Sequence, residues 1–168
     1  MLSDHDIARL IECPKAVTKP PRTTFLIEGR HRRNDFEVAA IDTAERSAVF
    51  MRQSLEFPEN FSIGLDYLSH PDSGRLCLIR CNGPHGEHRE IPGTPDHHFS
   101  CHIHLATAEA LQAGLRPESK ASRTDAFTTF EEAVAYFVRR CSIVDVAPML
   151  PFLSAELNRR EPFEEGDG

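Results

Sequence analysis

The sequence predicts an α+β fold, in which a twisted antiparallel sheet of five to six strands carries N- and C-terminal helices packed on one face. Short apolar runs separated by turn residues fill positions 23–105, a pattern typical of an antiparallel meander. Helical spacing of apolar residues replaces it near both ends of the chain. The 168 residues, 40% of them hydrophobic, fit a single domain over 1–160, and we expect the acidic tail 161–168 to be disordered.

The first predicted element is a short helix from Ser3 to Glu12. Ser3 suits the N-cap position, and Ile7, Leu10 and Ile11 form an apolar stripe along one side. Pro14 ends this helix, and Pro20-Pro21 predicts an extended connector rather than a regular element.

Six segments have the character of strands. They are Thr23–Glu28, Phe36–Ile41, Ala48–Gln53, Phe61–Leu68, Arg75–Cys81 and His97–Leu105. Pro71-Asp72-Ser73-Gly74 is a strong hairpin signal before the fifth of them. A loop of about 15 residues with several histidines precedes the sixth, and loops of that length in a compact domain are often functional.

Helical patterns return after the last predicted strand. Thr107 to Gly114 indicates one or two helical turns closed by glycine. A capping box at Thr129-Phe130-Glu131-Glu132 opens a helix that runs to about Cys141, which we expect to cover the apolar face of the sheet. Pro148 and Pro151 bracket a last short helix, which runs to about Asn158.

Composition excludes several classes of protein. The N-terminus lacks the pattern of a signal peptide, and no apolar run approaches the roughly 20 residues that span a bilayer, so we expect a cytoplasmic protein without membrane contact. The five cysteines form no C-x-x-C pair, which favours reduced thiols. Because the net charge is −7, we do not expect direct non-specific binding of nucleic acid.

Histidines are concentrated in one part of the chain, because six of the nine lie between His85 and His104. If His97–Leu105 is a strand, alternation puts His98, Ser100, His102 and His104 on one face and Phe99, Cys101, Ile103 and Leu105 on the apolar face. Residues two apart on a strand are roughly 6–7 Å apart, so His102 and His104 are placed to grip one ion or one phosphate.

A metal site is the first hypothesis for this cluster. Imidazole is a common ligand of zinc and other divalent transition metals, and His102-Ile103-His104 supplies two imidazoles at once. Possible third ligands are His85, His88, Asp96, His98 and Glu109. The spacing to Glu109 fits a cupin-type metal site, but the flanking glycines and the second histidine motif of that site are missing.

Phosphoester chemistry without a metal is a second hypothesis. His98-Phe99-Ser100-Cys101 matches the repeat of two-histidine phosphoesterases only once, and the histidine-triad pattern lacks one histidine. A ribonuclease with histidines as acid and base stays open. Its phosphate would then contact Arg30, Arg32 and Arg33, although a solvated hairpin turn, or a contact with an acidic partner, explains the same basic cluster.

The histidines also have a purely structural interpretation. His102 and His104 can hydrogen-bond across strands or to the Asn82-Gly83 turn, which would fix a loop without any chemistry. Cys101 falls on the apolar face in the predicted register, which disfavours a Cys/His dyad with His102.

Six pieces follow one another along the chain: Ile11-Glu12-Cys13-Pro14-Lys15, Phe50-Met51-Arg52-Gln53, Asn60-Phe61-Ser62-Ile63-Gly64-Leu65, Arg80-Cys81-Asn82-Gly83-Pro84-His85, Cys101-His102-Ile103-His104-Leu105-Ala106-Thr107, and Phe130-Glu131-Glu132-Ala133 to Cys141. In their order they resemble an uncharacterised family, a domain of unknown function, of small bacterial proteins associated with mobile elements. The C-H-I-H-x-A-T piece is the most distinctive. The resemblance implies one full-length domain and directs attention to Asn82, Gly83, His85, His102, His104 and Thr107.

Two functions follow as expectations. One is a metal- or phosphate-binding site around His85, His102 and His104, which would carry a divalent metal such as zinc and hydrolyse a phosphoester. The alternative is a non-enzymatic interaction or inhibitor protein of a mobile-element or defence system, in which the histidines are structural and the partner is another protein.

Overall fold

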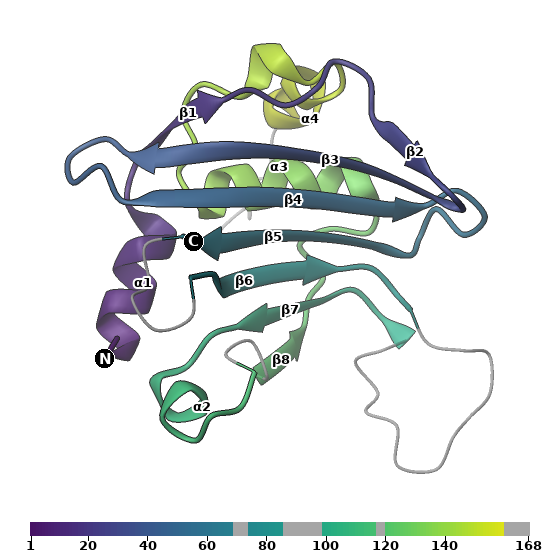
Figure 1. The fold of residues 1–168 in the computed structure, drawn as a ribbon. Helices are drawn as coiled ribbons and strands as arrows, with labels where there is room; N and C mark the ends of the chain where they lie inside the picture. Colours follow the sequence, from purple (N-terminus) through teal and green to yellow (C-terminus); the bar gives the residue numbers. More distant parts are fainter. Residues whose placement is uncertain (69–73, 86–98, 117–119, 160–168) are drawn as a thin grey trace, which may run out of the picture.

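The computed structural model describes residues 1–68, 74–85, 99–116 and 120–159. Eight strands form one antiparallel sheet, and their bounds are β1 (Lys15–Lys19), β2 (Leu26–Glu28), β3 (His31–Ala40), β4 (Arg46–Ser54), β5 (Phe61–Tyr67), β6 (Leu76–Asn82), β7 (His102–Leu105) and β8 (Lys120–Arg123). Their order in space is β1-β3-β4-β5-β6-β7-β8, with β2 paired to β3 beside β1 (Figure 1).

Four α-helices and one short 3-10 helix accompany the sheet in the described residues. They are α1 (Asp4–Glu12), α2 (Ala108–Gln112), α3 (Phe130–Arg140), η2 (Ala147–Met149) and α4 (Leu153–Asn158). Helix α3 lies across the back of the sheet in Figure 1, and α1 lies at one end of it. The predicted α+β class, the antiparallel sheet and the helices from both ends of the chain are therefore confirmed. The predicted tail 161–168 lies outside the described residues.

Alternation along the strands divides the sheet into two faces. Phe36, Val49, Leu65, Ile79 and Leu105 are cross-strand neighbours on the face toward α3, and all but the partly buried Leu105 are buried. Phe130 and Phe137 of α3 belong to the same core cluster. We call the opposite side the outer face, which carries Asp35, Phe50, Gly64, Arg80 and His104 at the positions between these residues.

The prediction of five to six strands was too low because β1 and β8 were missed. Strand β1 follows Pro14 directly, and its first residue is a buried lysine instead of an apolar residue. The Lys15 ammonium donates to the carbonyl oxygens of Ile11, Cys13 and Cys141 at 2.7, 2.8 and 3.0 Å. It thereby joins the ends of α1 and α3, where carbonyl groups lack helical partners.

The predicted strand His97–Leu105 is shorter than expected. Strand β7 begins at His102, Ser100 lies in a bend, and residues 97–98 lie outside the described residues. His102 and His104 do share one face, as predicted, and Cys101 is buried in the core. Phe99 was predicted on the apolar face of this strand, but it lies before β7 and is 48% exposed.

The basic segment 30–33 is mostly strand rather than turn. Only Gly29 and Arg30 form the turn, and β3 starts at His31. Alternation along β3 then sends Arg32 to the face toward α3 and Arg33 to the outer face. The structure therefore separates the arginines that were expected to act together.

Candidate functional site

The candidate site lies on the outer face, where β5, β6 and β7 run side by side. Asn82 is paired with Ser62 on one side and with His102 on the other. Arg80, two residues earlier on β6, is paired with His104. Cross-strand partners bring their side chains into contact, so these strands assemble a polar cluster on a sheet whose other face is apolar.

The tautomer of His102 follows from its hydrogen bonds. Its Nδ1 lies 2.8 Å from the carbonyl oxygen of Ser100, and a carbonyl only accepts, so Nδ1 donates. In neutral His102 the lone pair therefore belongs to Nε2. The ring is 0% exposed, which holds it in this orientation.

Two nitrogen atoms face that lone pair. His85 Nε2 lies 3.2 Å from His102 Nε2, and Asn82 Nδ2 lies 3.4 Å from it. The Ser62 hydroxyl donates to Asn82 Oδ1 at 2.8 Å, which turns the amide nitrogen of Asn82 toward the histidine. A chain of contacts thus runs from β5 through β6 to β7 and ends on the exposed imidazole of His85.

Gly83 determines where His85 lies. Its amide donates to the carbonyl oxygen of Phe61 at 3.0 Å, which extends the pairing of β5 and β6 by one residue. A side chain at this position would collide with the Glu59 carbonyl oxygen and the Phe61 ring. Glycine is therefore required by close approach, and it lets the chain turn so that His85 returns over His102.

His104 is a neighbour of this pair. Its ring centroid lies 4.9 Å from that of His102 in an edge-to-face arrangement, and it is 9% exposed. The described part of the chain holds no group of three or more His, Cys, Asp or Glu side chains placed for one metal ion. The structure thus brings His85 and His102 together without gathering His85, His102 and His104 around one point.

The remaining predicted ligands and the resemblance residue Thr107 have other surroundings. Glu109 is exposed on α2, and Thr107 caps that helix by accepting from the amide of Ala110. His88, Asp96 and His98 lie outside the described residues.

The three predicted phosphate-contact arginines have three separate environments. The Arg32 guanidinium lies over the rings of Phe25 and Phe130, at 4.7 and 5.2 Å from their centroids. Arg33 pairs with Glu28 at 3.0 Å, and the exposed Arg30 pairs with Glu56 at 3.4 Å. Arg32 is therefore a packing residue, and Arg33 alone projects from the outer face.

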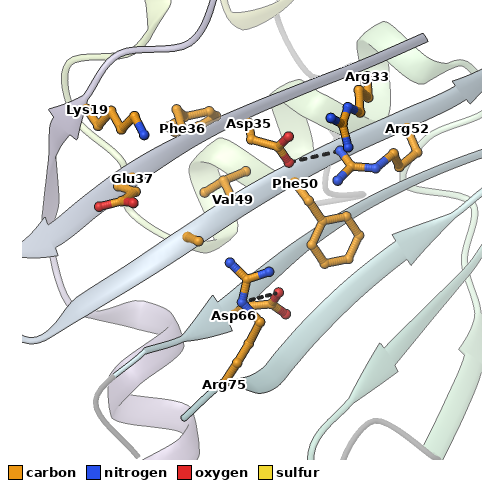
Figure 2. A pocket seen from close by; sticks show the side chains of 11 residues that line it. Lys19, Arg33, Asp35, Phe36, Glu37, Val49, Phe50, Arg52, Asp66 and Arg75 are labelled. Atoms are coloured by element: carbon orange, nitrogen blue, oxygen red, sulfur yellow. Dashed lines mark hydrogen bonds and ion pairs between the residues drawn. The ribbon is translucent and has the colours of Figure 1, made fainter. Parts of the chain in front are cut away.

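Sequence reasoning missed a depression of about 340 Å³ on the outer face. Figure 2 shows it with α3 behind the strands, and among its lining residues are Arg33, Asp35, Phe50, Arg52, Asp66 and Arg75. Ion pairs join Arg52 to Asp35 at 2.9 Å and Arg75 to Asp66 at 3.5 Å. Alternation along β3 was the available signal, because its outward residues in this stretch, Arg33, Asp35 and Glu37, are all polar.

The cysteines are free thiols, as expected, and three of them are buried. Burial raises the pKa of Cys141 to about 12 and that of Cys81 well above its ordinary value. Burial also raises the pKa of Cys101. These thiols stay protonated near neutral pH, so they are poor nucleophiles and poor metal ligands.

No described helix is long and apolar enough to cross a membrane. Comparison with protein-family models, with curated proteins and with solved structures yields no match to this chain.

Proposed function

We propose that His85 and His102 bind one divalent transition-metal ion, with zinc as the first candidate, and that this site hydrolyses a phosphoester. The observation that carries the proposal is the separation of 3.2 Å between the two Nε2 atoms. Tetrahedral zinc with Zn–N distances of about 2.0–2.1 Å holds two ligand nitrogens about 3.3 Å apart. The two ring centroids, 5.0 Å apart, fit the same arrangement.

The hydrogen bonds of His102 support this role. Metal-binding histidines commonly donate their second ring nitrogen to a backbone carbonyl, which fixes the tautomer and directs the other nitrogen at the ion. His102 makes this bond to Ser100. Without an ion, one lone pair serves both His85 and Asn82, and both distances are longer than the usual 2.9–3.0 Å of a good hydrogen bond.

Asn82 offers a third ligand. The oxygen and nitrogen of a side-chain amide have nearly the same shape, and rotation by half a turn exchanges them. The rotated amide would present Oδ1 to the ion and donate its nitrogen to the Ser62 hydroxyl, which also accepts hydrogen bonds. Two imidazoles and one amide oxygen leave a coordination position for water, as hydrolytic zinc sites require.

His85, His102 and Asn82 would hold the ion, and the ion would supply the hydrolytic chemistry by lowering the pKa of a water, so that a hydroxide would be available near neutral pH. The oxygen of that water would bond to phosphorus as the bond from phosphorus to the leaving oxygen breaks, and the proton released by the water would protonate the leaving oxygen. Arg80 lies on the same face, beside Asn82 and His102, where its charge favours the anionic phosphate.

The structural interpretation of the histidines is the second candidate, and one observation favours it. His102 is 0% exposed and its side-chain contacts join β6, the residues after it and the residues before β7, so it can hold the β6–β7 end together without any ion. The protein would then act through its surface as an interaction or inhibitor protein. The two candidates give opposite results in the same experiment.

The experiment is elemental analysis of tag-free protein purified without chelator, followed by zinc titration calorimetry. We expect about one zinc ion per chain in the wild type, and an affinity loss of about 100-fold or more in His85→Ala. His85 is exposed, so this variant should keep the circular dichroism spectrum and melting temperature of the wild type. His31→Ala removes another exposed histidine and is the matched control.

Hydrolysis is measured separately with bis(p-nitrophenyl) phosphate as the probe. Zinc-loaded wild type should release nitrophenolate, and His85→Ala should release it about 100-fold more slowly. A wild type that binds no zinc, manganese, nickel or iron would overturn the metal site and leave the structural candidate.

A further inference from the structure

We propose that the outer face of the sheet binds a single-stranded nucleic acid, which crosses Phe50 and leads toward His85. This inference rests on the proposed function, because it names the polymer whose phosphoester the site would cleave. It is carried by the alignment of basic and aromatic side chains across six neighbouring strands.

The first observation is a row of cross-strand partners that we call the basic row. The strand register places its members in one line across β3 to β8, and they are Arg33, Arg52, Ser62, Asn82, His102 and Arg123. With neighbouring strands about 4.8 Å apart, the row spans roughly 24 Å. Arg33, Arg52 and Arg123 are partly or fully exposed, whereas Asn82 and His102 between them are buried, so a bound strand would meet the histidine site at the exposed His85.

The next row toward the depression adds one arginine and one aromatic ring. Its members, in the same strand order, are Asp35, Phe50, Gly64, Arg80, His104 and Ala121. The two rows together hold four arginines and a single carboxylate. This local excess of positive charge stands out in a chain whose net charge is −7, and it favours a polyanion on this face.

Phe50 supplies a surface on which a base can stack. The tip of its ring occupies the space in which a side chain at position 64 would begin, so Gly64 lets the ring lie over β5. Figure 2 shows the flat side of the ring turned outward from the sheet. The Arg52 guanidinium carbon lies 5.7 Å from the ring centroid, beside the depression of about 340 Å³, a volume in the range of small-ligand sites.

A single strand fits this arrangement better than a duplex. Aromatic side chains on an open sheet take unpaired bases, whose faces are accessible, and basic side chains follow the backbone. The ion pairs Arg52–Asp35 and Arg33–Glu28 involve partly exposed carboxylates, with 50% and 65% of the side chain accessible. Pairs of this kind contribute little to stability, so phosphates can replace the carboxylates.

The arrangement of charge on the outer face explains why the net charge alone predicted no direct non-specific binding of nucleic acid. A charge of −7 disfavours binding over the whole surface. The two rows confine the favourable charge to one face, and stacking on Phe50 adds attraction that does not depend on charge. We therefore expect binding that weakens with salt, and that needs both the arginines and the ring.

The test is fluorescence anisotropy with labelled single strands of about 12 nucleotides, in an RNA and a DNA version of one sequence, against the matching duplex. Phe50→Ala and Arg52→Gln should each weaken single-strand binding about fivefold or more. Arg30→Gln removes the same charge from an exposed turn outside both rows, and should change binding less than about twofold. Gels after each titration confirm that the strands are intact.

The outcomes separate this inference from the proposed function. The inference is supported if the RNA or the DNA single strand binds more tightly than the duplex and if Phe50→Ala weakens that binding. Whichever of the two single strands binds more tightly identifies the sugar of the preferred polymer. The inference would be overturned by equal binding of duplex, by no effect of Phe50→Ala, or by polyglutamate competing as well as polyuridylate. Zinc retained without strand binding would count against this inference alone, whereas strand binding without zinc would count against the metal site alone.

Discussion

The Ser62 hydroxyl on β5 donates to Asn82 Oδ1 on β6 at 2.8 Å, and the amide nitrogen of the same Asn82 side chain faces Nε2 of His102 on β7. A residue two strands away is thus linked to the histidine pair through one amide group. Because an amide can present either atom, this contact makes Asn82 a position where metal binding and simple hydrogen bonding predict different results.

Substitutions of Asn82 should separate these two roles. Asn82→Asp offers an oxygen ligand in either orientation, so zinc affinity should be retained or increased. Asn82→Leu removes the ligand atom, and should weaken zinc binding about 10–100-fold. Titration calorimetry of the two variants makes the comparison. Equal affinity in Asn82→Leu and the wild type would mean that Asn82 is not a ligand.

Gly83→Ala should destabilise the protein and disturb the site together. The added methyl group would meet the Glu59 carbonyl oxygen and the Phe61 ring, which costs about 1–3 kcal/mol in the free energy of unfolding. Gly29→Ala is the control, because Gly29 has a φ of 62° and open space around its Cβ position. Urea unfolding should show a loss of about 1 kcal/mol there, with zinc affinity reduced only in Gly83→Ala.

Lys15→Met should be strongly destabilising, although lysine is ordinarily a surface residue. The change leaves three carbonyl oxygens without their donor, and we expect a loss of about 2–4 kcal/mol in unfolding free energy. Burial lowers the pKa of the Lys15 ammonium, and its three hydrogen bonds offset this cost. Lys19→Met, at an exposed position of the same strand, should change stability by less than about 0.5 kcal/mol.

Stability should fall in acid partly through Glu132. Hydrogen bonds from the Thr128 amide and hydroxyl hold the pKa of this carboxyl below its ordinary 4.5. A lowered pKa in the folded state adds stability above pH 4.5, and this contribution is lost as the pH falls through the folded value. Urea unfolding from about pH 7 to pH 3 should show a shallower decline in Glu132→Gln than in the wild type. An unchanged decline would rule out this contribution.

The sequence predicted the fold class because alternating and helical periods are strong in this chain. The strands that were missed lack those signals. Strand β1 has one central apolar residue, Val17, between lysines, and β8 reads Lys-Ala-Ser-Arg at the edge of the sheet. An edge strand needs fewer apolar residues because one side faces solvent, so hydrophobic periodicity does not reveal it.

The sequence predicted the part of the candidate site that depends on local periodicity. Alternation placed His102 and His104 on one face, since this depends only on local strand geometry. The approach of His85 to His102 depends on the turn at Gly83, and the pairing of Asn82 with both neighbours depends on strand register. Register and turn geometry are set by contacts far apart in the chain, which a single sequence does not display.

The position of β1 has a consequence for how the protein is made. Lys15 donates its amide to Ser142, accepts from the amide of Val144, and forms a parallel bridge with Ile143. The amide of Val17 donates to the carboxylate of Asp145. Lys15 and Cys141, which it contacts, are 126 residues apart in the sequence. Strand β1 is therefore synthesised long before its partners at this end leave the ribosome. The growing chain can pair its central strands during synthesis, but it can close this end only after residues 142–145 have been translated.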